Sequence, residues 1–172
     1  MTMNEARLAV VVTGVLLPYL ARIPGGQAWL MQYFHGDGGS HLFLGAFNAI
    51  TWVIILFATL LYRRVESLLV PAICGFSVLA FGHGTVDLMS SSTAAISLIW
   101  IPVFAAEAAL VGALGGLLAD WCLPKHRWLA LAVGVCALLA AWYFLWAQGT
   151  IRWPVYSHRY GAPGPAWEWM VK

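Results

Sequence analysis

The chain has 172 residues, of which 62% are hydrophobic and 9% are charged, and its formal net charge at pH 7 is +2. A water-soluble domain is about half apolar and a quarter charged, so this composition excludes an ordinary soluble globular protein. The small net charge also argues against binding to nucleic acid. Because the few charges are clustered between long apolar runs, we expect an all-α, polytopic integral membrane protein.

Residues 1–147 are predicted to form one domain of five transmembrane helices. The first apolar run, Leu8 to Ala21, is short for a span, and we expect its helix to bend or end near Pro18. A signal peptide is the alternative, but Tyr19 would occupy the −3 position of a cleavage after Ala21, where a small residue is expected. We therefore interpret this run as a retained first helix.

The first connection, Arg22 to His41, contains the apolar and aromatic segment Ala28 to Phe34, which we expect to lie along the membrane interface. A glycine-rich turn with the sequence HGDGGSH follows at residues 35–41. The other four predicted spans are Leu42 to Tyr62, Leu68 to Leu88, Ala94 to Asp120 and Trp128 to Ala147.

Five spans place the termini on opposite sides of the membrane, and the positive residues decide the orientation. The internal loops with clustered charge, Arg63 to Glu66 and Lys125 to Arg127, fall on one side. The turn from Ser90 to Thr93 carries no positive charge and falls on the other side. We therefore predict a cytoplasmic N-terminus and an external C-terminus in a bacterial inner membrane.

The C-terminal tail, residues 148–172, is rich in tryptophan, tyrosine and proline and shows no helical periodicity. Its aromatic residues are typical of the belt at a membrane interface, here the outer one. Anchoring on membrane lipid is the simplest interpretation. The alternative is docking on a partner subunit, because proline-rich aromatic segments offer contact surfaces that lose little conformational entropy on binding.

A set of polar residues is predicted to gather in the outer leaflet. His83 and Asp87 are four residues apart and share a helix face, where the carboxylate can fix the tautomer of the imidazole. Asn48 lies roughly 9 Å below the same edge, and Ser91 and Ser92 stand at the start of the next helix. Two interpretations remain open: a polar pair that stabilises the hairpin, or a site for a lipid, quinone or small-molecule headgroup.

A metal site is a third interpretation of this region. Asp37, His41, His83 and Asp87 are plausible hard and borderline ligands. The sequence contains no HxxxH or HExxH motif, and His83 is the one histidine within an apolar helix, so ligation of a haem by two histidines is not expected. The sequence therefore assigns no cofactor.

Glu107 lies near the middle of the predicted helix 94–120, about 20 Å below its outer end. A carboxyl group at that depth is either neutral or paired. Because no basic residue is expected at its depth in any span, we expect a neutral acid that donates to a backbone carbonyl or to Ser77. A proton-relay group is the alternative.

Small residues recur every four positions along the same helix, at Ala108, Gly112 and Gly116. Such a stripe predicts close packing against another helix, from this chain or from a partner. Besides membrane lipid, we therefore expect other membrane subunits, or a second copy, to bind through the helix 94–120 and the tail 148–172.

The leading functional hypothesis is an accessory or binding subunit of a larger membrane complex, rather than an enzyme. It rests on the small size of the chain, the small-residue stripe and the aromatic tail. The first alternative is a membrane-embedded isomerase or hydrolase that acts on a lipid-like substrate through His83, Asp87 and Glu107. The second is a transporter or proton-coupled carrier built around Glu107, against which the lack of an internal repeat counts.

Overall fold

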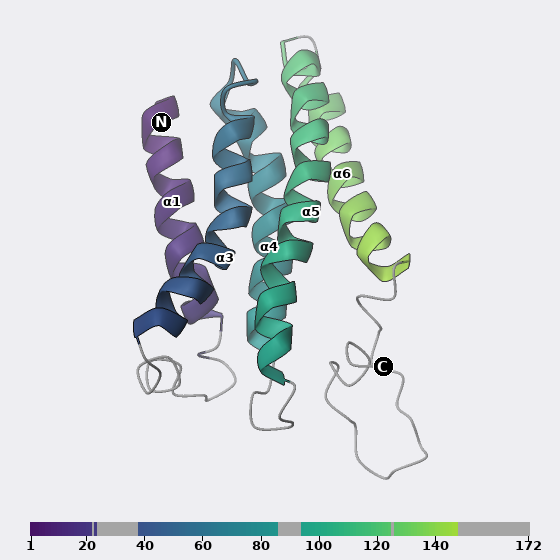
Figure 1. Ribbon diagram of the computed structural model, residues 1–172. Coiled ribbons are helices and arrows are strands. Elements are labelled where there is room, and N and C mark those ends of the chain that lie inside the picture. Colours follow the sequence, from purple (N-terminus) through teal and green to yellow (C-terminus); the bar gives the residue numbers. More distant parts are fainter. Residues whose placement is uncertain (22, 24–37, 86–93, 125, 148–172) are drawn as a thin grey trace.

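The computed structural model describes residues 1–21, 23, 38–85, 94–124 and 126–147, and it describes residues 38–44 and 94–97 by their backbone alone. Within these ranges the secondary structure is entirely helical, as the composition predicts, and the helices stand side by side in one bundle (Figure 1). The elements are α1 (Met3–Leu20), α3 (Gly38–Ala58), the 3-10 helix η2 (Val65–Leu68), α4 (Leu69–Thr85), α5 (Ala94–Cys122) and α6 (Arg127–Ala147).

Four helical segments are long and apolar enough to cross a membrane: residues 3–20, 65–85, 98–122 and 127–146. The part of α3 whose side chains are described, Gly45–Ala58, is a shorter apolar helix. The structure thus confirms an all-helical chain with four to five helices long and apolar enough to span a membrane. The side of the membrane on which each end lies stays a prediction, and the tail 148–172 lies outside the described residues.

The first helix begins earlier than the apolar pattern predicts, at Met3 instead of Leu8. Thr2 and Glu5 form a capping box, in which the Thr2 N–H donates to Glu5 Oε2 at 2.7 Å and the Glu5 N–H donates to Thr2 Oγ1 at 3.3 Å. This cap satisfies backbone donors that would otherwise need water. At its other end the helix continues through Pro18 to Leu20.

The second predicted span is displaced towards the N-terminus. α3 begins at Gly38, so part of the glycine-rich segment predicted as a turn, including His41, belongs to its first turn. The helix ends at Ala58 instead of Tyr62, and the N–H groups of residues 59–61 then bind carbonyl oxygens three residues earlier. Such tighter bonds are usual where a helix ends.

The third span is α4 preceded by the short helix η2, and the predicted end of this span, 86–88, lies outside the described residues. α5 extends two residues beyond its predicted end and passes through Pro102. α6 begins at Arg127, one residue before its predicted start.

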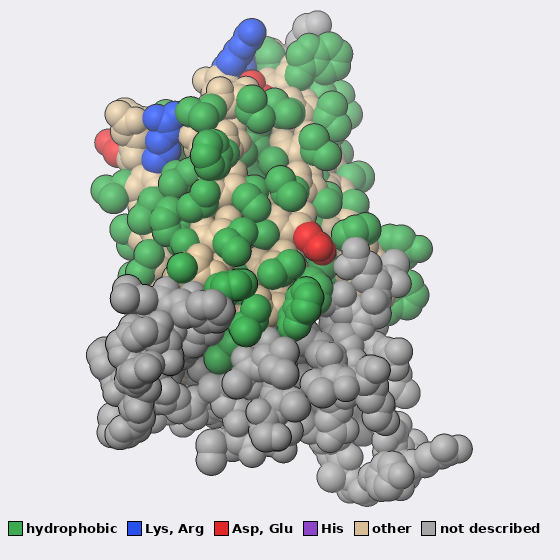
Figure 2. All heavy atoms as spheres, viewed as in Figure 1, with side chains coloured by type: hydrophobic (Ala, Val, Ile, Leu, Met, Phe, Trp, Pro, Cys, Tyr) green, Lys and Arg blue, Asp and Glu red, His purple; other side chains and the backbone are tan. Residues whose placement is uncertain are grey.

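α5 occupies the centre of the bundle and packs against α3, α4 and α6 (Figure 1). One buried cluster, which includes Leu79, Ile101 and Leu145, joins α4, α5 and α6. A second, around Val10 and Ile55, joins α1 and α3. Large hydrophobic side chains also cover much of the outer surface (Figure 2), as expected for helices that face lipid.

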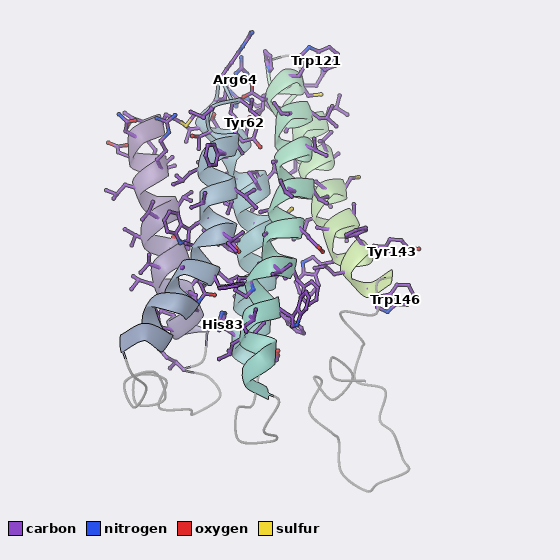
Figure 3. All side chains as sticks on the ribbon, viewed as in Figure 1. Tyr62, Arg64, His83, Trp121, Tyr143 and Trp146 are labelled. Carbon is purple, nitrogen blue, oxygen red and sulfur yellow. The ribbon has the colours of Figure 1, made fainter. Side chains whose placement is uncertain are left out.

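The described arginines gather at one end of the bundle, which we call the arginine end. Arg63 and Arg64 lie between α3 and η2, Arg127 begins α6, and Arg7 lies near the start of α1. The N-terminus and Arg64 mark this end in the views, and His83 lies towards the opposite end (Figures 1 and 3). The described arginines thus share one end of the bundle.

Candidate functional site

His83 lies near the end of α4 and is almost fully buried, with 1% of its surface exposed. Its Nε2 atom is 3.0 Å from Oδ1 of Asn48 on α3. Because an amide oxygen can only accept a hydrogen bond, Nε2 of His83 carries the hydrogen in this arrangement. Two of the predicted site residues are therefore brought together, and they connect α3 to α4.

The glycines on either side of His83 leave room for neighbouring segments of the chain, and not for a ligand. A Cβ atom at Gly82 would lie 2.5 Å from Cγ2 of Ile101 on α5. One at Gly84 would lie 3.0 Å from the backbone oxygen of Ala21, just after α1. α4 therefore packs closely on both neighbours at the level of His83, which explains how the imidazole is so completely enclosed.

A second buried contact joins α3 to α5 close by. The hydroxyl of Thr51 donates to the backbone oxygen of Pro102 at 3.2 Å, and the Thr51 side chain is fully buried. Thr51 is one turn from Asn48, so both polar residues of α3 point into the bundle. Interhelical hydrogen bonds of this kind stabilise membrane bundles by about 0.6 kcal/mol each on average.

The structure does not describe the side chains of the remaining residues of the predicted headgroup or metal site. Asp37, Asp87, Ser91 and Ser92 fall outside the described residues, and the side chain of His41 is not described. Their grouping with His83 stays a prediction. Among the residues that are described, no three histidine, cysteine, aspartate or glutamate side chains lie close enough to hold a metal ion.

Glu107 lies on the outer side of α5. It shares a helix face with Leu110 and Leu114, whose side chains are 53% and 67% exposed. Within the described ranges its Oε2 atom is buried and has no hydrogen-bond partner. Ser77, one of its expected partners, instead accepts from Trp142 Nε1 at 3.1 Å and donates to the backbone oxygen of Cys74 at 3.1 Å.

His83 and Glu107 do not belong to one constellation. Gly82 packs against Ile101, so His83 lies near the level of Ile101 on α5. Glu107 is six residues further along that helix, which is roughly 9 Å along its axis. His83 also points into the core, whereas Glu107 lies on the outer surface, so the two side chains face different surroundings.

The small-residue stripe of α5 packs within this chain. A Cβ atom at Gly112 would lie 2.6 Å from Cα of Pro71 on α4, and one at Gly116 would lie 2.9 Å from the backbone oxygen of Ser67. Ala108, the third member, is 1% exposed. This face of α5 is therefore occupied by α4 and η2, which leaves the opposite side for any partner.

Asp120, near the end of α5, forms a polar junction that the sequence did not single out. Its Oδ1 atom accepts from the Arg64 N–H at 3.0 Å and from the Ser67 hydroxyl at 2.8 Å, and Oδ2 accepts from the Arg63 N–H at 3.3 Å. Arg64 is the N-cap of η2 and has no side-chain cap of its own. An acidic side chain from another helix thus satisfies these donors.

Two further bonds fasten the arginine end. The Tyr62 hydroxyl donates to the backbone oxygen of Ala113 at 2.9 Å, and Arg7 Nε donates to Thr59 Oγ1 at 2.9 Å. The sequence gives only a weak signal for these contacts. It places polar residues near the predicted helix ends, but no spacing indicates which of them are in contact.

Comparison of the chain with protein-family models, with curated proteins and with solved structures finds no match.

Proposed function

We propose that this chain is an accessory subunit of a larger membrane complex, and that it binds another membrane protein through the outer side of α5. The binding surface consists of residues spaced alternately three and four apart along α5, which we call the α5 seam. Its members are Trp100, Val103, Glu107, Leu110 and Leu114. This spacing places all five on one stripe of the helix, as in helices that pair at a small crossing angle.

The observation that carries the proposal is that Glu107 stands half-buried in an apolar, outward-facing stripe, where its Oε2 atom has no hydrogen-bond partner among the described residues. An acidic residue at the middle of a membrane helix costs about 2.5–3.5 kcal/mol on insertion when nothing compensates for it. A neutral carboxyl both donates and accepts hydrogen bonds, so a polar group on a docked helix can satisfy it. Contact with lipid alone cannot do so.

The rest of the bundle supports a binding role over a catalytic one. His83, Asn48 and Thr51 are used in bonds between helices of the chain. The two described residues of the hypothetical catalytic set, His83 and Glu107, point in different directions and lie at different depths. Within the described residues, Glu107 on the seam takes no part in such a bond.

The orientation that goes with this proposal has the arginine end in the cytoplasm, because positive residues are retained on that side of a bacterial inner membrane. The seam then lies within the bilayer, with Trp100 nearer the outer surface and Leu114 nearer the cytoplasm. Glu107 is in the hydrocarbon region, where a hydrogen bond from a partner has the largest effect.

Photocrosslinking in native membranes tests the proposed surface. A photoreactive amino acid at position 110 or 114 is expected to give a discrete cross-linked product with another membrane protein. The same group at Phe57 on α3 or Leu139 on α6, which are 65% and 63% exposed, serves as the control and is expected to react with lipid alone. A cross-linked product of twice the mass of the chain would indicate that the seam binds a second copy of the chain and not a different membrane protein. Identical products from all four positions would contradict the proposal.

A further inference from the structure

A groove runs between α4 and α6 at the arginine end. Its volume is 290 Å³, and aliphatic side chains of both helices line it. Leu69 and Ile73 form one wall, and Leu131, Val135 and Leu138 form the other. Four of these residues are exposed and Leu138 is half-buried, so the groove is open to the surroundings of the bundle over most of its length.

Two opposite charges lie at the rim of this groove. Glu66 belongs to η2 and Arg127 is the first residue of α6, and both side chains are exposed. Neither forms a hydrogen bond or an ion pair with any part of the chain that the structure describes. Arg7, in contrast, is bonded to Thr59 and Asn4, and Asp120 is bonded to the η2 segment. Glu66 and Arg127 are thus available to a ligand.

The length of the groove matches one leaflet of a bilayer. From Arg127 to Leu138 it follows α6 for eleven residues, or roughly 16 Å. The hydrocarbon core of a bilayer is about 30 Å thick, so one leaflet accounts for about half of it. An aliphatic groove of this length, with charges at the arginine end, suits one acyl chain of a phospholipid whose headgroup lies at the rim.

We propose that the groove binds a phospholipid with a zwitterionic, primary-amine headgroup, of the phosphatidylethanolamine type. An acyl chain lies along Leu69, Ile73 and Leu138, and the phosphate contacts Arg127, whose guanidinium matches phosphate oxygens in a bidentate manner. The ammonium group donates to the Glu66 carboxylate. A choline headgroup has no N–H to donate, and a glycerol headgroup has no positive charge, so both are expected to bind less tightly.

Gly134 provides a way to close the groove. A Cβ atom at this position would lie 3.4 Å from Cγ2 of Val70, which is an ordinary contact. A leucine there extends into the space between α4 and α6 without forcing the backbones apart. Gly45→Leu is the matched control, because a Cβ atom at Gly45 meets nothing within 4 Å.

The test is native mass spectrometry of the delipidated full-length chain in detergent, titrated with phosphatidylethanolamine, phosphatidylcholine and phosphatidylglycerol of identical acyl chains. We expect one tightly bound phosphatidylethanolamine per chain. Arg127→Gln should weaken all three lipids about tenfold, since each has a phosphate, and Glu66→Gln should weaken phosphatidylethanolamine alone about tenfold. Gly134→Leu should weaken all three, and Arg7→Gln and Gly45→Leu should change none.

Equal binding of the three lipids by the unaltered chain, with no effect of Arg127→Gln or Glu66→Gln, would overturn the inference. So would a second copy of the chain bound in place of lipid and lost in Gly134→Leu. Both rim residues are exposed and form no bond with the described part of the chain, so their variants are expected to fold. Their results test the inference even if Gly134→Leu does not fold. No partner protein is needed, and the outcome is independent of the role of the α5 seam.

Discussion

Asp120 on α5 accepts a hydrogen bond from the Ser67 hydroxyl at 2.8 Å and thereby fixes the start of η2 and α4 from a neighbouring helix. Asp120→Ala removes this bond and the two from backbone N–H groups, so we expect a loss of about 1.5–3 kcal/mol in the free energy of unfolding. Asp120→Asn keeps one acceptor oxygen and should cost less. Thermal unfolding in detergent measures both, with Glu66→Ala as the control for lost charge. Equal shifts for Asp120→Ala and Glu66→Ala would contradict the role of the junction.

The packing of the small-residue stripe predicts a steric penalty at Gly112. Its missing Cβ leaves room for the backbone of Pro71, which cannot move aside as a side chain could. Gly112→Leu is therefore expected to lower the free energy of unfolding by about 1–3 kcal/mol or more, the range typical of an overpacked core. Gly45→Leu, in open space, should be close to neutral in the same thermal assay. Because leucine forms helices better than glycine, helix propensity favours both variants, and a comparable loss for both would contradict the tight packing of Gly112.

His83 and Asn48 are expected to behave as one unit. In a double-mutant cycle with His83→Phe and Asn48→Leu, the coupling in the free energy of unfolding should be about 0.5–3 kcal/mol, because either single change leaves the other polar group buried without this bond. The matching cycle of His83→Phe with Asp87→Leu tests the site predicted from the sequence. Additive losses in the first cycle would mean that the 3.0 Å contact does not contribute to stability.

The sequence was sufficient to predict the helices because four of the five apolar runs have the length of a span and the first is continuous, although short. It could not place their ends, since those depend on partners distant in the sequence: Asp120 caps η2 from another helix, and Tyr62 lies beyond α3 with its hydroxyl on Ala113. Nor could it show which side of α5 faces outward, because that helix is apolar on every side. The close approach of Gly112 to Pro71 and the exposure of Leu110 and Leu114 decide this, and only the structure supplies them.

The clustering of Arg7, Arg63, Arg64 and Arg127 predicts that the arginine end is cytoplasmic. In a chain without other cysteines, Arg64→Cys should resist an impermeant thiol reagent in intact cells and react after the membrane is opened. Trp146→Cys, at the opposite end in Figure 3, should react in intact cells. The reverse pattern would invert the orientation and leave the fold unchanged.

The isolated chain should tolerate the loss of the acid at position 107. Because Glu107 forms no hydrogen bond with the described part of the chain, Glu107→Gln is expected to leave the free energy of unfolding within about 0.5 kcal/mol of its original value. Glu107→Leu should raise it, since an apolar side chain suits the surface around Leu110 and Leu114 better. A clear destabilisation by either variant, measured by thermal unfolding, would indicate that the chain itself uses the carboxyl.

The most direct test of the accessory role is the mass of the complex obtained by mild solubilisation of native membranes. We predict that the unaltered chain is found with a stoichiometric membrane partner, that Glu107→Gln retains it through an amide that still donates and accepts, and that Glu107→Leu releases it from an otherwise folded chain. A chain that is found alone in all three preparations, or that keeps the same partner when Glu107 is leucine, would contradict the proposal that the α5 seam is the binding surface.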